Sequence, residues 1–93
     1  MPYYVYVLRS NGDGNNYVGC TNNLKRRIEE HNSGKVYSTK HRRSIRVIYL
    51  EVYLNEKDAF AREKFLKSGW GKNYLKRVLK NYFRSNEAKK LGG

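Results

Sequence analysis

Four side chains stand out in this sequence because their types suit work on a charged substrate: Tyr6, Tyr17, Arg27 and Glu63. Each also has an ordinary structural interpretation. Strand tyrosines are usually packing residues, and a helix arginine is often a solvated charge whose stem covers apolar surface. A carboxylate on a core-facing side is costly unless a cation or metal meets it. The elements that carry these four residues therefore decide between chemistry and packing.

The two tyrosines belong to a predicted hairpin. Residues 3–8 are aromatic, β-branched or aliphatic and predict a strand, whereas residues 10–16 are rich in Gly, Asn and Asp and predict a turn. Extended chain restarts at Tyr17. Because side chains alternate along a strand, the pairing places Tyr17 near Tyr6 on one sheet surface. Gly19 permits another group to approach its backbone closely.

A helix is predicted next, with Thr21 or Asn22 as its N-cap and its end near Asn32, before a Ser-Gly pair. On a helical wheel, His31 falls on the apolar stripe and Arg27 at the edge of that stripe. Both should therefore lie on the side facing the sheet. His31 is equally well interpreted as a satisfied, partly buried ring near a helix end.

The two segments after this helix differ in character. Residues 35–44 are polar and basic and predict a surface loop, in which Lys40, Arg42 and Arg43 would grip phosphates. A merely solvated loop fits the same residues equally well. Residues 45–54 are mostly apolar on both faces and predict a third strand that sits centrally or is covered on both sides.

The second helix is predicted from a cap at Asn55 to about Lys67. Glu63 lies inside its buried stripe, three residues before Leu66. Its position fits either a metal-binding carboxylate or an ion pair with Arg27 that has no chemical role. The wheel alone does not choose between them.

The C-terminal part is predicted as a hydrophobic plug at Trp70 followed by an amphipathic helix over residues 73–84. Lys72 is one of the basic side chains expected on its exposed sides, where it would contact nucleic acid. Residues 85–93 predict a polar tail. The expected organisation is thus one domain over residues 1–84 and a tail.

The composition of the chain indicates which classes of binding partner suit it. The chain has 93 residues, enough for one small core, and a formal charge of +12 from twenty Lys and Arg against eight acids. A polyanion would relieve this self-repulsion, which favours nucleic acid first and an anionic membrane surface second. No segment predicts membrane insertion or a signal peptide. The single cysteine, Cys20, excludes an internal disulfide and fits a reducing, cytoplasmic compartment.

The expected order is strand-strand-helix-strand-helix-helix, an α+β fold with a three-stranded, mainly antiparallel sheet flanked by helices. The sequence resembles the GIY-YIG endonuclease superfamily, notably small stand-alone bacterial members similar to the nuclease domain of excision-repair proteins. Tyr4-Val5-Tyr6 and Tyr17-Val18-Gly19 stand where the two signature tripeptides would be. Residues 23–27 resemble the helix with the family's arginine, and residues 61–67 the segment with its metal-binding glutamate.

The resemblance implies a DNA endonuclease that depends on Mg²⁺, or Mn²⁺ in its place, with a role in DNA repair. Tyr6 would be the general base or would position the attacking water, and Tyr17 would hold the water or phosphate. Arg27 would stabilise the transition-state charge. Glu63 would bind the metal, and His31 would donate to the phosphate or the leaving oxygen. Since a phenol is a weak base at neutral pH, Arg27 and the metal would have to favour its ionised form.

Three positions depart from the family's pattern. Tyr4 replaces a glycine, Cys20 stands where repair-type members carry lysine, and Asn73 is too close to Glu63 to match a late asparagine of some members. Two other functions therefore stay open: a non-catalytic nucleic-acid-binding module on the same fold, and a basic protein that coats RNA. A protein partner would supply specificity, since the chain has no room for another domain.

Overall fold

The computed structural model describes residues 1–10, 14–36 and 45–85. The chain forms two compact units, Met1–Glu63 and Lys64–Gly93. The basic residues Lys40, Arg42 and Arg43 lie outside the described residues, so the predicted basic loop stays a prediction, as does the boundary at residue 84. Within the described ranges, no helix is long and apolar enough to cross a membrane.

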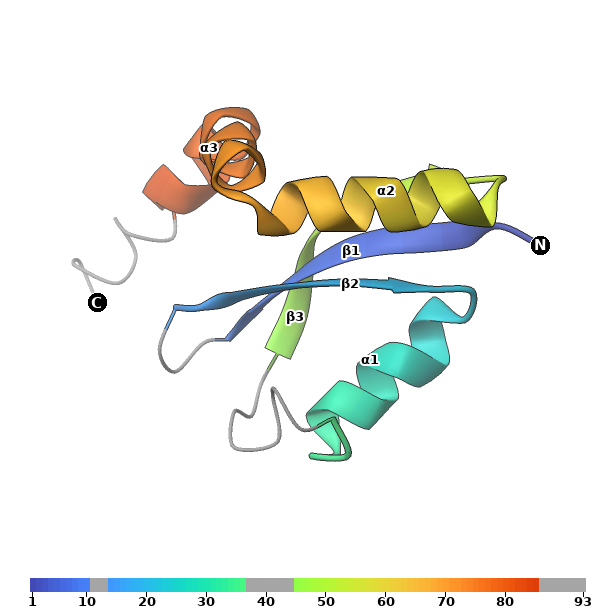
Figure 1. Cartoon of the computed structure of the whole chain (residues 1–93). Coiled ribbons are helices and arrows are strands. Elements are labelled where there is room, and N and C mark those ends of the chain that lie inside the picture. Colours follow the sequence, from blue (N-terminus) through green and yellow to red (C-terminus); the bar gives the residue numbers. More distant parts are fainter. Residues whose placement is uncertain (11–13, 37–44, 86–93) are drawn as a thin grey trace. The chain divides into compact units, whose positions relative to one another are not determined.

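The first unit is built on a three-stranded antiparallel sheet, as the sequence predicts (Figure 1). Its strands are β1 (Tyr3–Ser10), β2 (Asn16–Thr21) and β3 (Ile45–Tyr53), in the order β2-β1-β3. The prediction that β3 is central or covered on both faces is wrong, because β3 is an edge strand and Val52 is 55% exposed. β1 is equally apolar and holds the central place, bonded on both sides.

The two faces of the sheet carry different helices, and Figure 1 shows α1 (Leu24–Asn32) and α2 (Glu56–Lys67) on opposite sides. Tyr6 and Leu8 form a buried cluster on the α1 side, against which Ile28 packs. The side chains that alternate with them, such as Val5, point to the α2 side. The Tyr3 ring there lies 6.2 Å from that of Phe60 on α2. Every residue of β1 from Val5 to Leu8 is consequently buried.

Two residues separate α1 from the strand that precedes it. Its N-cap is Asn23, whose side chain accepts a hydrogen bond from the Arg26 backbone N–H at 3.1 Å. The predicted caps Thr21 and Asn22 are therefore wrong. Thr21 instead accepts a bond from the Asn23 N–H with its Oγ1, which fixes the turn into the helix. The predicted end at Asn32 is confirmed.

The second unit contains the end of α2 and the helix α3 (Gly69–Val78). Ser68 caps α3 by accepting a bond from the Gly71 N–H at 3.2 Å. The helix therefore starts four residues earlier than predicted and includes Trp70 in its first turn. Trp70 is 80% exposed, so its interpretation as a buried plug is wrong. After a turn at Leu79 the chain is helical again over residues 80–85.

Candidate active site

Tyr6 lies on β1 directly opposite Gly19 of β2, and its ring crosses over that glycine. A methyl group at Gly19 would overlap the Tyr6 hydroxyl and ring, so the absence of a side chain there makes room for the phenol. The expected close approach at Gly19 is thus confirmed, and the approaching group is Tyr6. Since β2 is an edge strand, the ring directs its hydroxyl toward the edge of the sheet.

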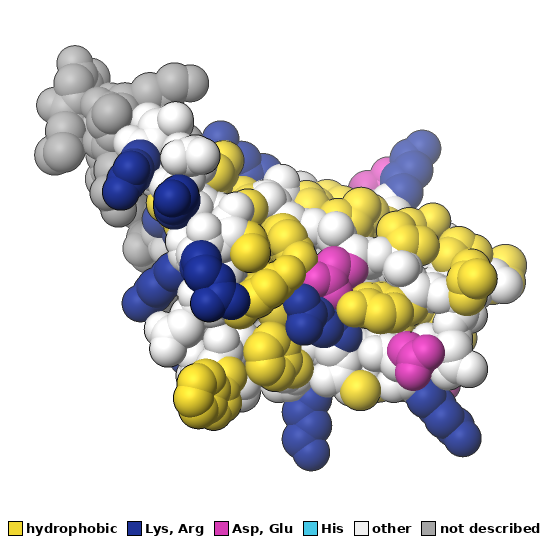
Figure 2. Space-filling view, turned by 90° about the horizontal axis from the view of Figure 1, so that it is seen from above, with side chains coloured by type: hydrophobic (Ala, Val, Ile, Leu, Met, Phe, Trp, Pro, Cys, Tyr) yellow, Lys and Arg dark blue, Asp and Glu magenta, His cyan; other side chains and the backbone are white. Residues whose placement is uncertain are grey.

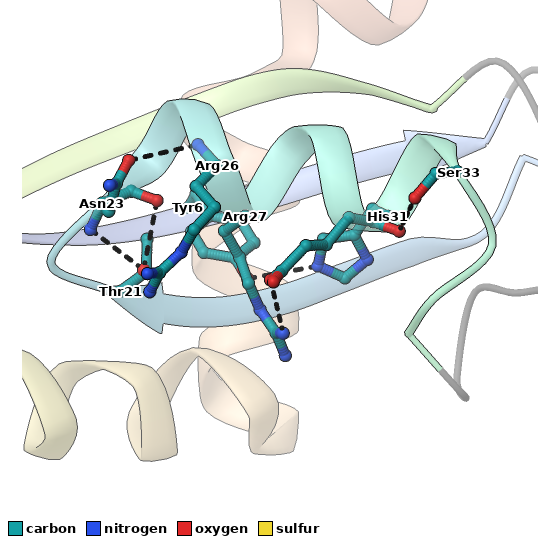
Figure 3. A network of polar contacts seen from close by, with 8 residues as sticks. Tyr6, Thr21, Asn23, Arg26, Arg27, His31 and Ser33 are labelled. Atoms are coloured by element: carbon teal, nitrogen blue, oxygen red, sulfur yellow. Dashed lines mark hydrogen bonds and ion pairs between the residues drawn. The ribbon is translucent and has the colours of Figure 1, made fainter.

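His31, in the last turn of α1, contacts this hydroxyl. Its Nε2 lies 3.2 Å from the Tyr6 hydroxyl oxygen, and the two rings meet edge to face at 6.0 Å (Figure 3). His31 is only 5% exposed. Burial, and then the nearby Arg27 charge, hold the pKa of His31 below its usual value, so its ring is neutral at pH 7. The prediction that His31 shares a helix face with Arg27 and faces the sheet is confirmed, whereas its contact with Tyr6 was not predicted.

Arg27 acts on the same hydroxyl from the middle of α1. Its guanidinium is close enough to lower the pKa of the Tyr6 phenol, and it forms an ion pair with Glu30 at 3.2 Å. The acid in this ion pair lies one turn ahead of Arg27 on its own helix. The Arg27 and Glu30 side chains are 41% and 34% exposed, so this pair is screened by solvent and weak.

Glu63 is half-buried on α2, and its charge reaches both Tyr6 and Cys20. Cys20 lies opposite Val5 and so faces the α2 side, whereas Tyr6 faces the α1 side. Tyr6 therefore lies on one side of β2, and Cys20 lies on the other. In the described part of the chain, no three residues among His, Cys, Asp and Glu converge on one point. A cation here would rest on Glu63, water and substrate oxygens, a ligand set that suits Mg²⁺.

The pKa of Tyr6 reflects these neighbours. Burial raises the pKa of the Tyr6 phenol most strongly, the Arg27 hydrogen bond and charge lower it, and the Glu63 charge raises it again. The net pKa is above the usual value. Arg27 alone therefore does not offset the effect of burial on the phenol. The expectation was that Arg27 and a metal together favour its ionised form.

Tyr17 lies on β2 opposite Leu8, on the same face as Tyr6, and packs against the cluster that contains both. The predicted proximity of the two tyrosines is confirmed. Lys72 is exposed on α3 in the second unit. The five predicted catalytic residues thus all belong to the first unit, where His31 contacts the Tyr6 hydroxyl and the charges of Arg27 and Glu63 act on it.

Comparison with known proteins shows which family the chain belongs to. The family model described as the GIY-YIG catalytic domain matches residues 2–77. The chain belongs to the GIY-YIG family.

Its relatives in this family are small bacterial proteins. A UPF0213 protein of Pediococcus pentosaceus is 39% identical over 80 residues, which cover 85% of this chain and 83% of the relative. One from Clostridium perfringens is 38% identical over 65 residues, 69% of each chain. The solution NMR structure of a UPF0213 protein from Bacillus halodurans is similar, with 32% identity, a TM-score of 0.54, and coverage of 84% of this chain and 85% of the other.

In this GIY-YIG chain, a further network holds α2 against β3. Glu51 accepts hydrogen bonds from the Tyr49 and Tyr53 hydroxyls, and from Arg62 at 2.9 Å and 3.0 Å. Burial acts to raise the pKa of Glu51, but these bonds outweigh burial and hold it below its usual value. Arg62 precedes Glu63, so the network fixes the helix turn that carries the candidate metal ligand. Nothing local in the sequence links Glu51 to Arg62.

Proposed function

We propose that this chain is a divalent-metal-dependent endonuclease that hydrolyses phosphodiester bonds of DNA, and that Tyr6, Tyr17, Arg27, His31 and Glu63 form its active site. One observation carries the proposal. The Tyr6 hydroxyl is hydrogen-bonded to a neutral, buried imidazole and feels both the Arg27 guanidinium and the Glu63 carboxylate. Strand tyrosines that only pack have no need of a hydrogen-bonded imidazole and of a cation and an acid whose charges act on the same phenol.

His31 gives Tyr6 a place to send its proton. In the tautomer protonated at Nδ1, the Nε2 atom accepts the Tyr6 hydroxyl proton as Tyr6 takes one from the attacking water. The water oxygen then bonds to phosphorus, the bond to the leaving oxygen breaks, and that oxygen takes a proton from solvent. This assigns His31 to the attacking side rather than to the leaving oxygen.

Arg27 would bind the phosphate being cleaved. Its ion pair with Glu30 is exposed and weak, so a phosphate oxygen can replace Glu30 at the guanidinium. There Arg27 would stabilise the extra negative charge of the transition state. Glu63 would hold the cation, and Mg²⁺ at that carboxylate would supply further positive charge to the phosphate. Tyr17 would support Tyr6 from the same face of the sheet.

A nicking assay tests this assignment. We expect supercoiled plasmid, flap or branched DNA to be nicked with Mg²⁺ or Mn²⁺ and not with EDTA, and Tyr6→Phe, Arg27→Ala and Glu63→Ala each to lose about 100-fold or more in rate. Arg26→Ala and Asp58→Asn are matched controls, because each removes an exposed charge of the same sign from the same helix. Wild-type nicking that persists in EDTA, or in Glu63→Ala, would contradict the mechanism.

The second candidate is a nucleic-acid-binding module without turnover. The raised pKa of Tyr6 favours it, because a protonated phenol is slow to activate water. This candidate predicts salt-sensitive binding by the wild type and no nicking on any of the substrates. The same substrates made in RNA test whether the sugar matters. Preference for flap or branched DNA would support action in repair, and activation by an added protein would identify a partner that supplies specificity.

A further inference from the structure

Trp70 is the most exposed aromatic side chain that the structure describes, with 80% of its surface open to solvent. Its place in the first turn of α3 is fixed by its neighbours. Gly71 packs so closely on the backbone of Phe65 and Leu66 that a side chain there would overlap it. Ser68 caps the same turn. The indole is therefore held outward by a rigid turn, and not left exposed by a loose end.

Every charged residue in the described part of the second unit is basic. Residues 64–85 contain seven Lys or Arg and no Asp or Glu, and all seven are exposed: Lys64, Lys67, Lys72, Lys76, Arg77, Lys80 and Arg84. Figure 2 shows dark blue Lys and Arg side chains beside yellow ones over α3. A flat apolar ring among positive charges fits a partner that offers both flat rings and negative charges.

Two partners bind an exposed apolar ring together with positive charges, a nucleic acid and an anionic membrane surface. Helix insertion at a membrane surface needs an apolar stripe that faces outward. In α3 Leu75 is only 4% exposed, and Val78, at 44%, is the one exposed large hydrophobic side chain of this helix besides Trp70, too few for such a stripe. One outward ring with phosphate-binding charges is instead the arrangement by which proteins stack on a base of an unpaired strand.

We propose that Trp70 stacks on an unpaired base and that Lys72 and its basic neighbours bind the adjoining phosphates, so that the second unit prefers single strands, gaps and flaps over blunt duplex. The inference deepens the proposed function by naming its substrate class, and it rests on that function for the identity of the polymer. In an intact duplex the bases are stacked on each other. Only the bases at its ends expose a face on which the indole can stack.

The fluorescence of Trp70 tests the proposal directly, because it is the only tryptophan. The protein is titrated with a single-stranded oligonucleotide, a blunt duplex and a gapped duplex in EDTA, so no cleavage is needed. We expect strong quenching by the single strand and the gapped duplex, and weak quenching by the blunt duplex at equal saturation. Anionic vesicles are a further arm, and a larger spectral change with vesicles than with any DNA would overturn the proposal.

Affinity measured with labelled oligonucleotides supplies the second readout. Trp70→Ala should weaken binding of the gapped duplex about 10-fold and of the blunt duplex less than about 2-fold, whereas Trp70→Phe keeps most of the affinity. Lys72→Gln should weaken both and reduce the salt slope by about one. Equal losses on both DNAs in Trp70→Ala, with a folded protein by circular dichroism, would refute stacking. Loss of nicking leaves these binding results unaffected, so failure of the proposed enzyme and failure of this inference are separable.

Discussion

The contact between Tyr6 and Gly19 makes a sharp prediction for the variant Gly19→Ala. The φ angle of Gly19 lies outside the left-handed region, so alanine meets no backbone strain. In a strand, alanine is ordinarily more stable than glycine by about 0.5–1 kcal/mol. Here, however, the added methyl overlaps the hydroxyl and ring of Tyr6, a side chain only 2% exposed that contacts His31.

Overpacking of this kind costs about 1–3 kcal/mol, so Gly19→Ala should lower the free energy of unfolding by about 1 kcal/mol, and by up to about 2.5 kcal/mol, overall. Displacement of the Tyr6 ring should also break its bond to His31, shift the His31 ring signals in NMR spectra, and reduce nicking toward the level of Tyr6→Phe. Gly69→Ala is the matched control, because nothing lies within 4 Å of a methyl group there.

A double-mutant cycle measured by urea unfolding completes the test. Tyr6→Phe removes the atom nearest to the new methyl, so Gly19→Ala should cost less in that background, with a coupling of at least about 0.5 kcal/mol. If Gly19→Ala is as stable as the wild type and leaves the His31 signals in place, the ring does not cross Gly19 and the account of the site is wrong.

Two further predictions concern stability. Since the pKa of His31 is lowered on folding, the unfolded chain binds more protons below pH 6.5, and stability should fall as the pH drops from about 7 to 5. His31→Gln should flatten that slope in urea unfolding, and an unchanged slope would contradict a neutral His31. Arg62→Met should cost about 1.5–3 kcal/mol, because Glu51 loses its charged hydrogen bonds. Glu30→Gln, which breaks an exposed pair, should cost less than about 1 kcal/mol, and equal losses would refute the distinction.

The fold was largely predictable because its elements are short and their periods clear. The apolar, β-branched and aromatic runs of β1 and β3 predicted both strands, but such a run does not report which strand lies between two others. That is why β3 was misplaced. The cap of α1 was missed because Thr21, Asn22 and Asn23 are all capable caps, and only the backbone geometry selects Asn23.

Those parts of the site that depend on helical spacing or on strand pairing were predictable from the sequence. Helical spacing put Arg27 and His31 on one face, and strand pairing put Tyr17 near Tyr6. The bond between Tyr6 and His31 depends on how α1 crosses the sheet, which no local pattern contains. The ion pair between Arg27 and Glu30 was predictable, because residues three apart on a helix are neighbours.

The charges around Tyr6 argue for a cation in the working site. Burial and the Glu63 charge both raise the pKa of Tyr6, and only Arg27 opposes them. For a phenol that must lose its proton, a bare carboxylate nearby is a disadvantage, and a protein that only bound phosphate would gain nothing from it. A divalent ion at Glu63 reverses the sign of that influence, so the same residue then favours loss of the proton. On the proposed mechanism, metal binding and activation of Tyr6 are therefore linked, and His31 receives the proton that the linkage releases.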